Sequence, residues 1–343
     1  MFSALSRRKL LSGAKGLAMV AAATLAAAPA FANDKVTLGA LRFTSHGAGF
    51  VALEKGYFAE EGLDVELEFF QSAQPIAVAT ASGDVDFGIT GVTGGLMNLA
   101  EKGAIRIVGG VLHEKAGFDG MMILASNKAY DEGLTEVADI PGHSVAMTQV
   151  GSTFHYMTHL IAEDQGWNMD DIRMVPLQKV GAMVAALKSG QVDVMIMVPH
   201  IAKALVESGA AKEIGWLNDY AEYQISAIIT SVKNIEDNRG MVERFLRAYS
   251  KGIADVNAAL LDPNADPAAK EEVTRMIHKY VYADQPYEKA APSIQNGAMY
   301  LNEGAALNKT DVGVQMQWFT DEKLVDSDLT VDQLVDSTFV KTY

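Results

Sequence analysis

The sequence contains no cysteine. This absence excludes disulfide bonds, thiolate metal sites and a cysteine nucleophile, and it also excludes a lipid anchor on an N-terminal cysteine. Basic residues are scarce too, because 28 Lys and Arg stand against 43 Asp and Glu and leave a net charge of −15. Nucleic acid is therefore not expected as a partner, since its binding depends on basic surfaces.

Familiar catalytic motifs are missing as well. There is no P-loop and no G-x-S-x-G nucleophile elbow, and the nearest sequence, G-H-S-V-A at 142–146, lies at the start of a strand. His155 and His159 are spaced like two metal ligands on one helical face, but no H-E-x-x-H or other carboxylate signature accompanies them. We predict that the protein is not an enzyme and needs no cofactor or metal.

Residues 1–32 have the pattern of an export signal. They combine four basic and no acidic residues with an apolar stretch at 17–28 and small residues at 30–32. The segment S-R-R-K-L-L at 6–11 matches the twin-arginine pattern, with Leu where Phe is more usual, and the general secretory route is the alternative. No later segment has 18 uninterrupted apolar residues. We expect a soluble protein of the bacterial periplasm without a lipid anchor.

The pentad S-G-x-V-D occurs twice, at 82–86 and 189–193, and each copy closes an apolar helical stretch. In each copy the glycine, Gly83 or Gly190, is expected to end the helix in the left-handed conformation, and the valine leads into a strand. The repetition predicts two similarly built lobes. Asp86 and Asp193 would then hold equivalent architectural positions and would not form a carboxylate pair.

The alternation of apolar segments and turns predicts an α/β fold with two doubly wound sheets joined by two crossing strands. The first lobe is expected to comprise residues 33–125 and 227–343, and the second lobe residues 126–226. A long helix is expected at 241–260, another through Val273 and Ile277, and others around Met299 and Trp318. Strands are expected at 36–41, 65–70, 87–90, 105–111, 121–125, 144–148, 172–177, 192–198 and 226–230.

In a two-lobed α/β protein, ligands bind between the lobes at the carboxyl ends of strands, near helix N-termini. The corresponding turns here are at 44–49, 71–74, 90–94, 151–154 and 198–200. Neutral histidine can both donate and accept a hydrogen bond, and five of the seven histidines fall in or beside these turns, namely His46, His113, His155, His159 and His200. The hydroxyls of Ser152 and Thr153, next to helix-terminal amides, would suit a sulfonate, a carboxylate or a ring carbonyl.

Several segments resemble the periplasmic substrate-binding proteins of ABC importers for nitrate, sulfonates, taurine and thiamine-pyrimidine precursors, and the similarity extends to about residue 260. The most specific are E-K-G-Y-F at 54–58, E-G-L-D-V at 61–65, and the segments 81–88, 139–142, 150–153 and 186–193. The resemblance implies a two-lobed, type II periplasmic binding protein that acts as a monomer. It also implies capture of a small polar organic ligand and delivery to an inner-membrane ABC permease with its ATPase.

Together, the turns and the resemblance identify candidate ligand contacts at His46, Gly47, Gln71, Ser72, Thr90, Gly91, Val92, Thr93, His113, Gly151, Ser152, Thr153, Phe154, Pro199 and His200. The segment M-V-P-H at 197–200 departs from the Trp-Glu-Pro common in the family, and Lys179 is the main cation near the turns. A pyrimidine or aromatic acid therefore fits at least as well as a sulfonate. The alternatives are a secreted enzyme related to the pyrimidine synthase of this fold, which relies on a cysteine-rich iron site, and a histidine-based metal-binding protein.

Overall fold

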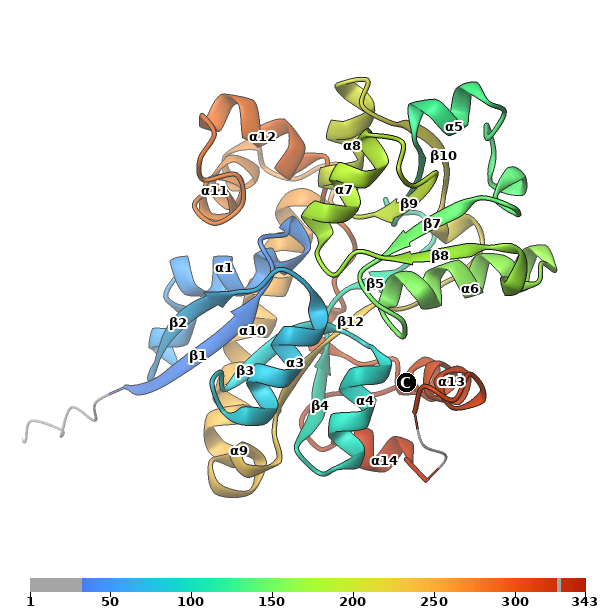
Figure 1. Cartoon of the computed structure of the whole chain (residues 1–343). Helices are drawn as coiled ribbons and strands as arrows, with labels where there is room; N and C mark the ends of the chain where they lie inside the picture. The colour runs from blue at the N-terminus through green and yellow to red at the C-terminus, as the bar shows by residue number, and fades with distance from the viewer. Residues whose placement is uncertain (1–32, 326–327) are drawn as a thin grey trace, which may run out of the picture. The chain divides into compact units, whose positions relative to one another are not determined.

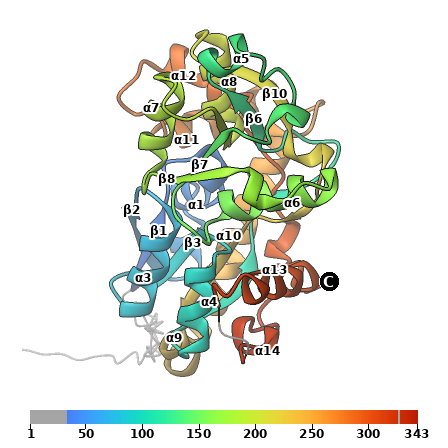
Figure 2. The ribbon, with the colours of Figure 1, turned by 45° about the vertical axis from the view of Figure 1, so that its right-hand side comes forward.

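The computed structural model describes residues 33–325 and 328–343, so the predicted export signal lies outside the described residues. Within these ranges no helix has the length and hydropathy needed to cross a bilayer. Strands and helices alternate along most of the chain, as Figures 1 and 2 show. The strands form two five-stranded sheets and one short two-stranded pair.

The first sheet has the strand order β2-β1-β3-β12-β4. Strands β2, β1 and β3 are parallel, whereas β12 is antiparallel to both of its neighbours. Its strands are β1 (Asp34–Ala40), β2 (Leu63–Phe69), β3 (Phe87–Gly91), β4 (Ile105–Gly110) and β12 (Ser226–Ser231).

The second sheet repeats this arrangement with the order β8-β7-β9-β6-β10. Here β8, β7 and β9 are parallel, and β6 is antiparallel to both of its neighbours. The predicted repetition of two similarly built α/β halves is thus confirmed by the sheet topology. Its strands are β6 (Met122–Ala125), β7 (Ser144–Met147), β8 (Arg173–Pro176), β9 (Val194–Met197) and β10 (Lys212–Trp216).

Two chain segments pass between the sheets and pair with each other as β5 (His113–Glu114) and β11 (Tyr223–Gln224), which are antiparallel. The first passage lies before Met122, because β6 already belongs to the second sheet. We predict from the sequence that residues through 125 belong to the first lobe, since the apolar run at 121–125 does not reveal which sheet it joins. The division into two lobes stays a prediction, with its first boundary better placed before β6.

Helices cover the sheets and connect the parallel strands. The apolar stripe predicted at 241–260 is the buried face of α10 (Arg239–Leu260), and the ring of Phe245 stacks on Phe87 of β3 with centroids 3.8 Å apart. The other helices are α1 (Gly47–Glu54), α2 (Tyr57–Glu60), α3 (Ala73–Ser82), α4 (Gly94–Glu101), α5 (Asn127–Asp131), α6 (Thr153–Gln165), α7 (Val180–Lys188), α8 (Pro199–Glu207), α9 (Val232–Asp237), α11 (Pro267–His278), α12 (Tyr287–Gln295), α13 (Lys309–Asp321) and α14 (Val331–Leu334), with 3-10 turns η1 (Thr44–His46), η2 (Val137–Asp139), η3 (Met169–Asp171), η4 (Leu217–Asp219) and η5 (Glu303–Ala305).

Two expectations for the C-terminal third have different outcomes. Trp318 lies in α13, as predicted. The helix expected around Met299 is wrong, because α12 ends at Gln295, residues 296–297 form a turn, and Leu301 bridges to Leu112. Pairing with the segment that leaves β4 replaces helical hydrogen bonds there, and the local apolar pattern does not reveal such a long-range contact.

Both pentads have the predicted conformation. Gly83 and Gly190 have φ values of 84° and 69°, in the left-handed region that favours glycine. The carboxylate Oδ2 of Asp86 accepts a hydrogen bond from the N–H of Thr37 in β1 at 2.8 Å, and that of Asp193 accepts one from the N–H of Ser144 in β7 at 2.9 Å. Asp86 directly precedes β3 and therefore links this strand to β1. Asp193 directly precedes β9 and links that strand to β7.

Candidate functional site

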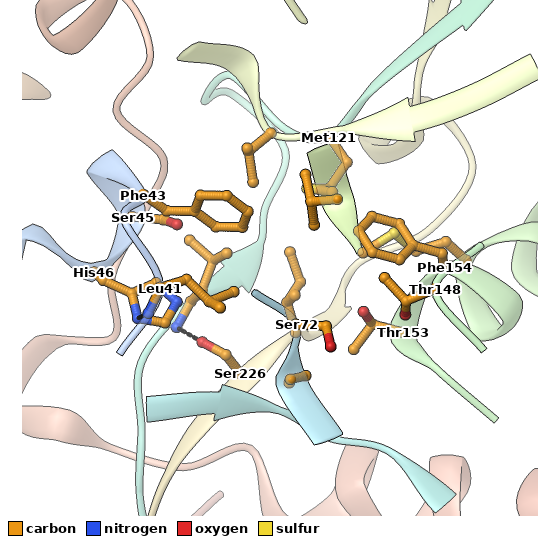
Figure 3. A pocket seen from close by; sticks show the side chains of 17 residues that line it. Leu41, Phe43, Ser45, His46, Ser72, Met121, Thr148, Thr153, Phe154 and Ser226 are labelled. Carbon is orange, nitrogen blue, oxygen red and sulfur yellow. Dashed lines mark hydrogen bonds between the residues drawn. The ribbon is translucent and has the colours of Figure 1, made fainter. Parts of the chain in front are cut away.

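A cavity lies where the carboxyl ends of strands from both sheets meet. Its volume is about 60 Å³, more than a single water needs. It therefore has room for a compact molecule. Figure 3 shows its seventeen lining residues: Leu41, Phe43, Ser45, His46, Ser72, Ala73, Gly91, Leu112, Met121, Thr148, Thr153, Phe154, Met157, Val180, Val198, Ile225 and Ser226.

Two aromatic rings face this cavity from different parts of the fold. Phe43 follows β1 of the first sheet, whereas Phe154 lies in the first turn of α6, beside the second sheet. In Figure 3 the two rings point into the same space from opposite sides, with Met121 above them. Rings placed in this way can hold a flat molecule through stacking or edge contacts.

Two histidines pack edge-on against the Phe43 ring. The ring of His46 is edge-on to Phe43 with centroids 5.9 Å apart, and the ring of His200 is edge-on at 5.4 Å. Burial lowers the pKa of His46 to about 3, and burial together with the nearby His46 lowers the pKa of His200 to about 3. Both rings are therefore neutral at neutral pH, and neither supplies a positive charge.

Hydrogen bonding fixes how His46 presents its ring. Its Nδ1 accepts a hydrogen bond from the backbone N–H of Leu41 at 3.3 Å. Because a neutral imidazole carries one proton, that proton is on Nε2, which can donate to a ligand. His46 is 6 % exposed and lines the cavity.

Two helix N-termini are directed at the cavity without side-chain caps. The residue preceding α3 is Ser72 and the residue preceding α6 is Ser152, and neither hydroxyl accepts a bond from its own helix. The Ser152 hydroxyl is buried and without a partner among the described residues, as is the hydroxyl of Ser45, which lines the cavity. Buried hydroxyls without partners cost stability, so their retention is typical of a site that a ligand completes.

The lining carries no charged side chain at neutral pH. Ten of the seventeen residues are apolar, and the polar ones are serine, threonine and the neutral His46. Lys179, the cation expected near the ligand, instead lines a separate hollow with Gln71 and Gln178. Lys179 directly precedes α7, and the next residue, Val180, rather than Lys179 lines the cavity.

The structure brings five of the fifteen sequence candidates to the cavity, namely His46, Ser72, Gly91, Thr153 and Phe154. Ligand contact by these five stays a prediction. The other ten do not line it, and three are engaged elsewhere: Thr93 caps α4, Thr90 donates to the carbonyl of Ala73, and His113 lines another hollow with Lys115. Outside the lining are Gly47, Gln71, Thr90, Val92, Thr93, His113, Gly151, Ser152, Pro199 and His200.

Sequence reasoning missed most of the apolar lining. Met157 lies four residues after Thr153 on the same face of α6, so helical spacing would have found it. Val180 begins α7, and Val198 follows β9 in the turn expected at 198–200. Leu112, Met121 and Ile225 come from the two passages between the sheets, where no local pattern indicates a site.

The histidine pair on α6 does not converge as metal ligands would. The ring of His159 stacks on Trp318 with centroids 4.9 Å apart, and the ring of His155 meets the same indole edge-on at 5.2 Å. Over residues 33–325 and 328–343, no group of three or more histidine, aspartate or glutamate side chains is placed to hold a metal ion. Both rings thus pack against an aromatic neighbour.

Comparison with known proteins gives three results. The sequence model of the family described as NMT1/THI5 like matches residues 43–263. A candidate binding protein of Brucella abortus is 24% identical over 223 residues, 64% of this chain and 66% of its own length, so slightly under two thirds of that relative is matched. The formylaminopyrimidine-binding protein of Halalkalibacterium halodurans is 25% identical over 210 residues, 59% of this chain and 60% of its own length.

Among solved structures, the periplasmic aliphatic sulphonate binding protein SsuA of Escherichia coli aligns with a TM-score of 0.67. The alignment covers 88% of this chain and 92% of that chain at 17% sequence identity. This similarity shows the fold of a periplasmic binding protein, which the sequence analysis predicts.

Proposed function

Because the chain belongs to the NMT1/THI5-like family, we propose that it is a periplasmic solute-binding protein that captures a small aromatic or heteroaromatic molecule in the cavity. The ligand is then delivered to an ABC permease with its ATPase. The observation that carries this proposal is the pair Phe43 and Phe154, which reach one cavity from opposite halves of the fold. A ligand held between them would tie the two halves together.

The composition of the cavity favours this ligand class over small inorganic anions. Phe43, Met121, Phe154 and Met157 supply apolar and polarisable surface, which suits the faces of an aromatic ring. The hydroxyls and the helix N-termini then supply a few donors that orient it, as in most small-molecule sites. A curated relative is named for binding formylaminopyrimidine, which is itself a substituted heteroaromatic ring.

Transport, rather than chemistry, is the role we propose for the site. The relatives are named as binding proteins, and the lining consists of apolar, hydroxyl and neutral imidazole groups without an ionised acid or base. We expect the neighbouring genes to encode a permease and an ATPase. Their absence, together with turnover of a bound compound, would favour a secreted enzyme instead.

Thermal melting of the purified protein against a compound library tests the proposal. The library should contain pyrimidines, aromatic acids and their amides, alkanesulfonates, nitrate and zinc. A compound present at about 100 times its dissociation constant stabilises the protein by roughly 2.7 kcal/mol, which gives a clear rise in melting temperature. We expect the aromatic or heteroaromatic compounds to produce that rise.

A matched pair of variants assigns any such rise to the cavity. Phe154→Leu removes a cavity ring while keeping an apolar side chain, whereas Val150→Ala changes an exposed residue nearby. The first variant should lose the ligand-induced shift and the second should keep it. A shift produced only by zinc, or one unchanged in Phe154→Leu, would overturn the proposal.

A further inference from the structure

We infer that the cavity selects an uncharged planar ligand and that His46 recognises it by donating a hydrogen bond from Nε2 to a carbonyl oxygen or ring nitrogen. This inference deepens the proposed function and rests on it. It concerns the charge and hydrogen-bonding polarity of the ligand, which neither the fold nor the similarity to other binding proteins determines.

The lining of the cavity offers no charged side chain that could pair with an ionic ligand. None of the seventeen lining residues is Asp, Glu, Lys or Arg. An ion moved from water into such an apolar space loses its hydration without gaining a charged partner, whereas a neutral polar group needs only its hydrogen bonds. The lysines nearest in sequence to the lining, Lys115 and Lys179, line other hollows.

The cavity is also bordered by groups that donate hydrogen bonds. The Leu41 N–H occupies Nδ1 of His46, which leaves an N–H on Nε2 of the neutral ring. The uncapped N-termini of α3 and α6 also present backbone N–H groups beside Ser72 and Ser152. These N–H groups only donate, whereas the hydroxyls of the lining can donate or accept, so a ligand with acceptor atoms is complementary to both.

Helix N-termini bind full anions as well as neutral acceptor groups, so they do not by themselves distinguish an anionic ligand from a neutral one. Each terminus carries roughly half an elementary charge, and such partial charges attract any acceptor atom. What favours a neutral ligand here is the rest of the wall, since Leu41, Phe43 and Met121 face the same space and offer no hydration to an ion. A dipolar acceptor satisfies the amides without this cost.

Two substitutions separate Nε2 of His46, the nitrogen to which the inference assigns ligand contact, from Nδ1, which is bonded to Leu41. In His46→Asn the side-chain oxygen can replace Nδ1 as the acceptor for Leu41, but no donor reaches the Nε2 position. In His46→Gln the longer amide can place its NH2 near the Nε2 position. His46→Asn should therefore lose ligand recognition while keeping the loop, and His46→Gln should retain much of the recognition.

Calorimetric titration with matched pairs of probes tests the inference. The pairs are benzamide with benzoate, nicotinamide with nicotinate, and uracil with orotate, at neutral pH. In at least one pair the neutral member should bind at least about tenfold more tightly than its anion, the factor that corresponds to about 1.4 kcal/mol. His46→Asn should weaken that neutral probe by about tenfold or more and His46→Gln by less, with the melting temperature of both free variants close to that of the wild type.

The outcomes distinguish the inference from the proposed function. Tighter binding of an anionic member, binding of alkanesulfonates alone, or unchanged binding of the neutral probe by His46→Asn would overturn the inference while the binding function stands. Failure of every organic compound and every probe to bind would overturn both. If His46→Asn melts well below the wild type, His46→Gln decides: binding of the neutral probe within about tenfold of the wild type supports the inference, and a larger loss overturns it.

Discussion

The backbone N–H of Leu41 donates a hydrogen bond to Nδ1 of His46 across 3.3 Å. Leu41 follows β1 directly and His46 ends the 3-10 turn η1 at the start of α1, so the bond closes the loop that carries Phe43 into the cavity. It fixes both the position of the Phe43 ring and the proton on the histidine. One local interaction thus determines the shape and the polarity of one wall of the site.

The buried histidines make stability depend on pH. The pKa values of His46 and His200 are lowered to about 3 from the usual 6.5, so below about pH 6.5 the unfolded chain takes up protons that the folded protein does not. Stability should then fall as the pH drops from about 6.5 toward 3, by up to about 1.4 kcal/mol per pH unit for each histidine. Urea unfolding at several pH values should show a smaller slope for His46→Gln, and an equal slope would contradict the expected neutral ring.

Glu114 makes the stability depend on pH in the opposite direction. It is fully buried, both carboxyl oxygens lie about 3 Å from the N of Met121, and burial raises its pKa from 4.5 to about 8. The folded protein therefore keeps a proton that the unfolded chain has lost, so this residue costs stability as the pH rises from about 4.5 to 8. Relative to the wild type, Glu114→Gln should gain on the order of 5 kcal/mol between the ends of this window.

The control for Glu114 is Glu236→Gln, which removes an exposed carboxylate from α9. Its difference from the wild type at each pH is the baseline against which the Glu114→Gln profile is compared. Equal pH profiles for Glu114→Gln and the wild type would show that the buried carboxyl does not hold its proton.

The pentad aspartates should affect stability and leave binding intact. Asp86 and Asp193 each accept a hydrogen bond from a backbone N–H of the neighbouring strand, and bonds to charged groups are worth roughly 1.5–3 kcal/mol. Asp86→Ala and Asp193→Ala should each lower the unfolding free energy by about that amount. Asp84→Ala, in the exposed part of the same pentad, should stay within about 0.5 kcal/mol. Loss of ligand affinity in folded Asp193→Ala would contradict the architectural role.

Gly91 tests how closely the two halves approach at the cavity. A Cβ at this position would lie 2.5 Å from Cγ2 of Thr153 at the start of α6, and both residues line the cavity. Gly91→Ala should therefore separate the two walls and weaken the best-binding probe by about tenfold or more. Gly181→Ala in α7 is the control, because its Cβ would meet nothing within 4 Å. Equal affinities in titration would show that the approach of these walls does not matter for binding.

The sequence predicted the fold better than the site, for a physical reason. Strands such as 87–90 and the apolar stripe at 241–260 are marked by local periodicity, and Gly83 and Gly190 by the left-handed conformation that ends a helix. The pentad repetition predicted two similarly built halves, and the two sheets share one order of parallel and antiparallel strands.

The cavity is built from residues that no single motif connects. The turns are correctly located, but whether Lys179 or Val180 reaches the cavity depends on where α7 begins. Leu112 and Ile225 enter only because β5 and β11 pair between the sheets. Local patterns identify the edge on which a ligand binds, whereas the lining itself follows from tertiary packing.

A crystal structure of the protein with the tightest-binding neutral probe tests the central claim most directly. The account predicts a ring between Phe43 and Phe154, with an acceptor atom at hydrogen-bond distance, about 2.7–3.2 Å, from Nε2 of His46. A probe bound instead in the hollow beside Lys179 or Lys115, or one that turns a donor group toward His46, would contradict it.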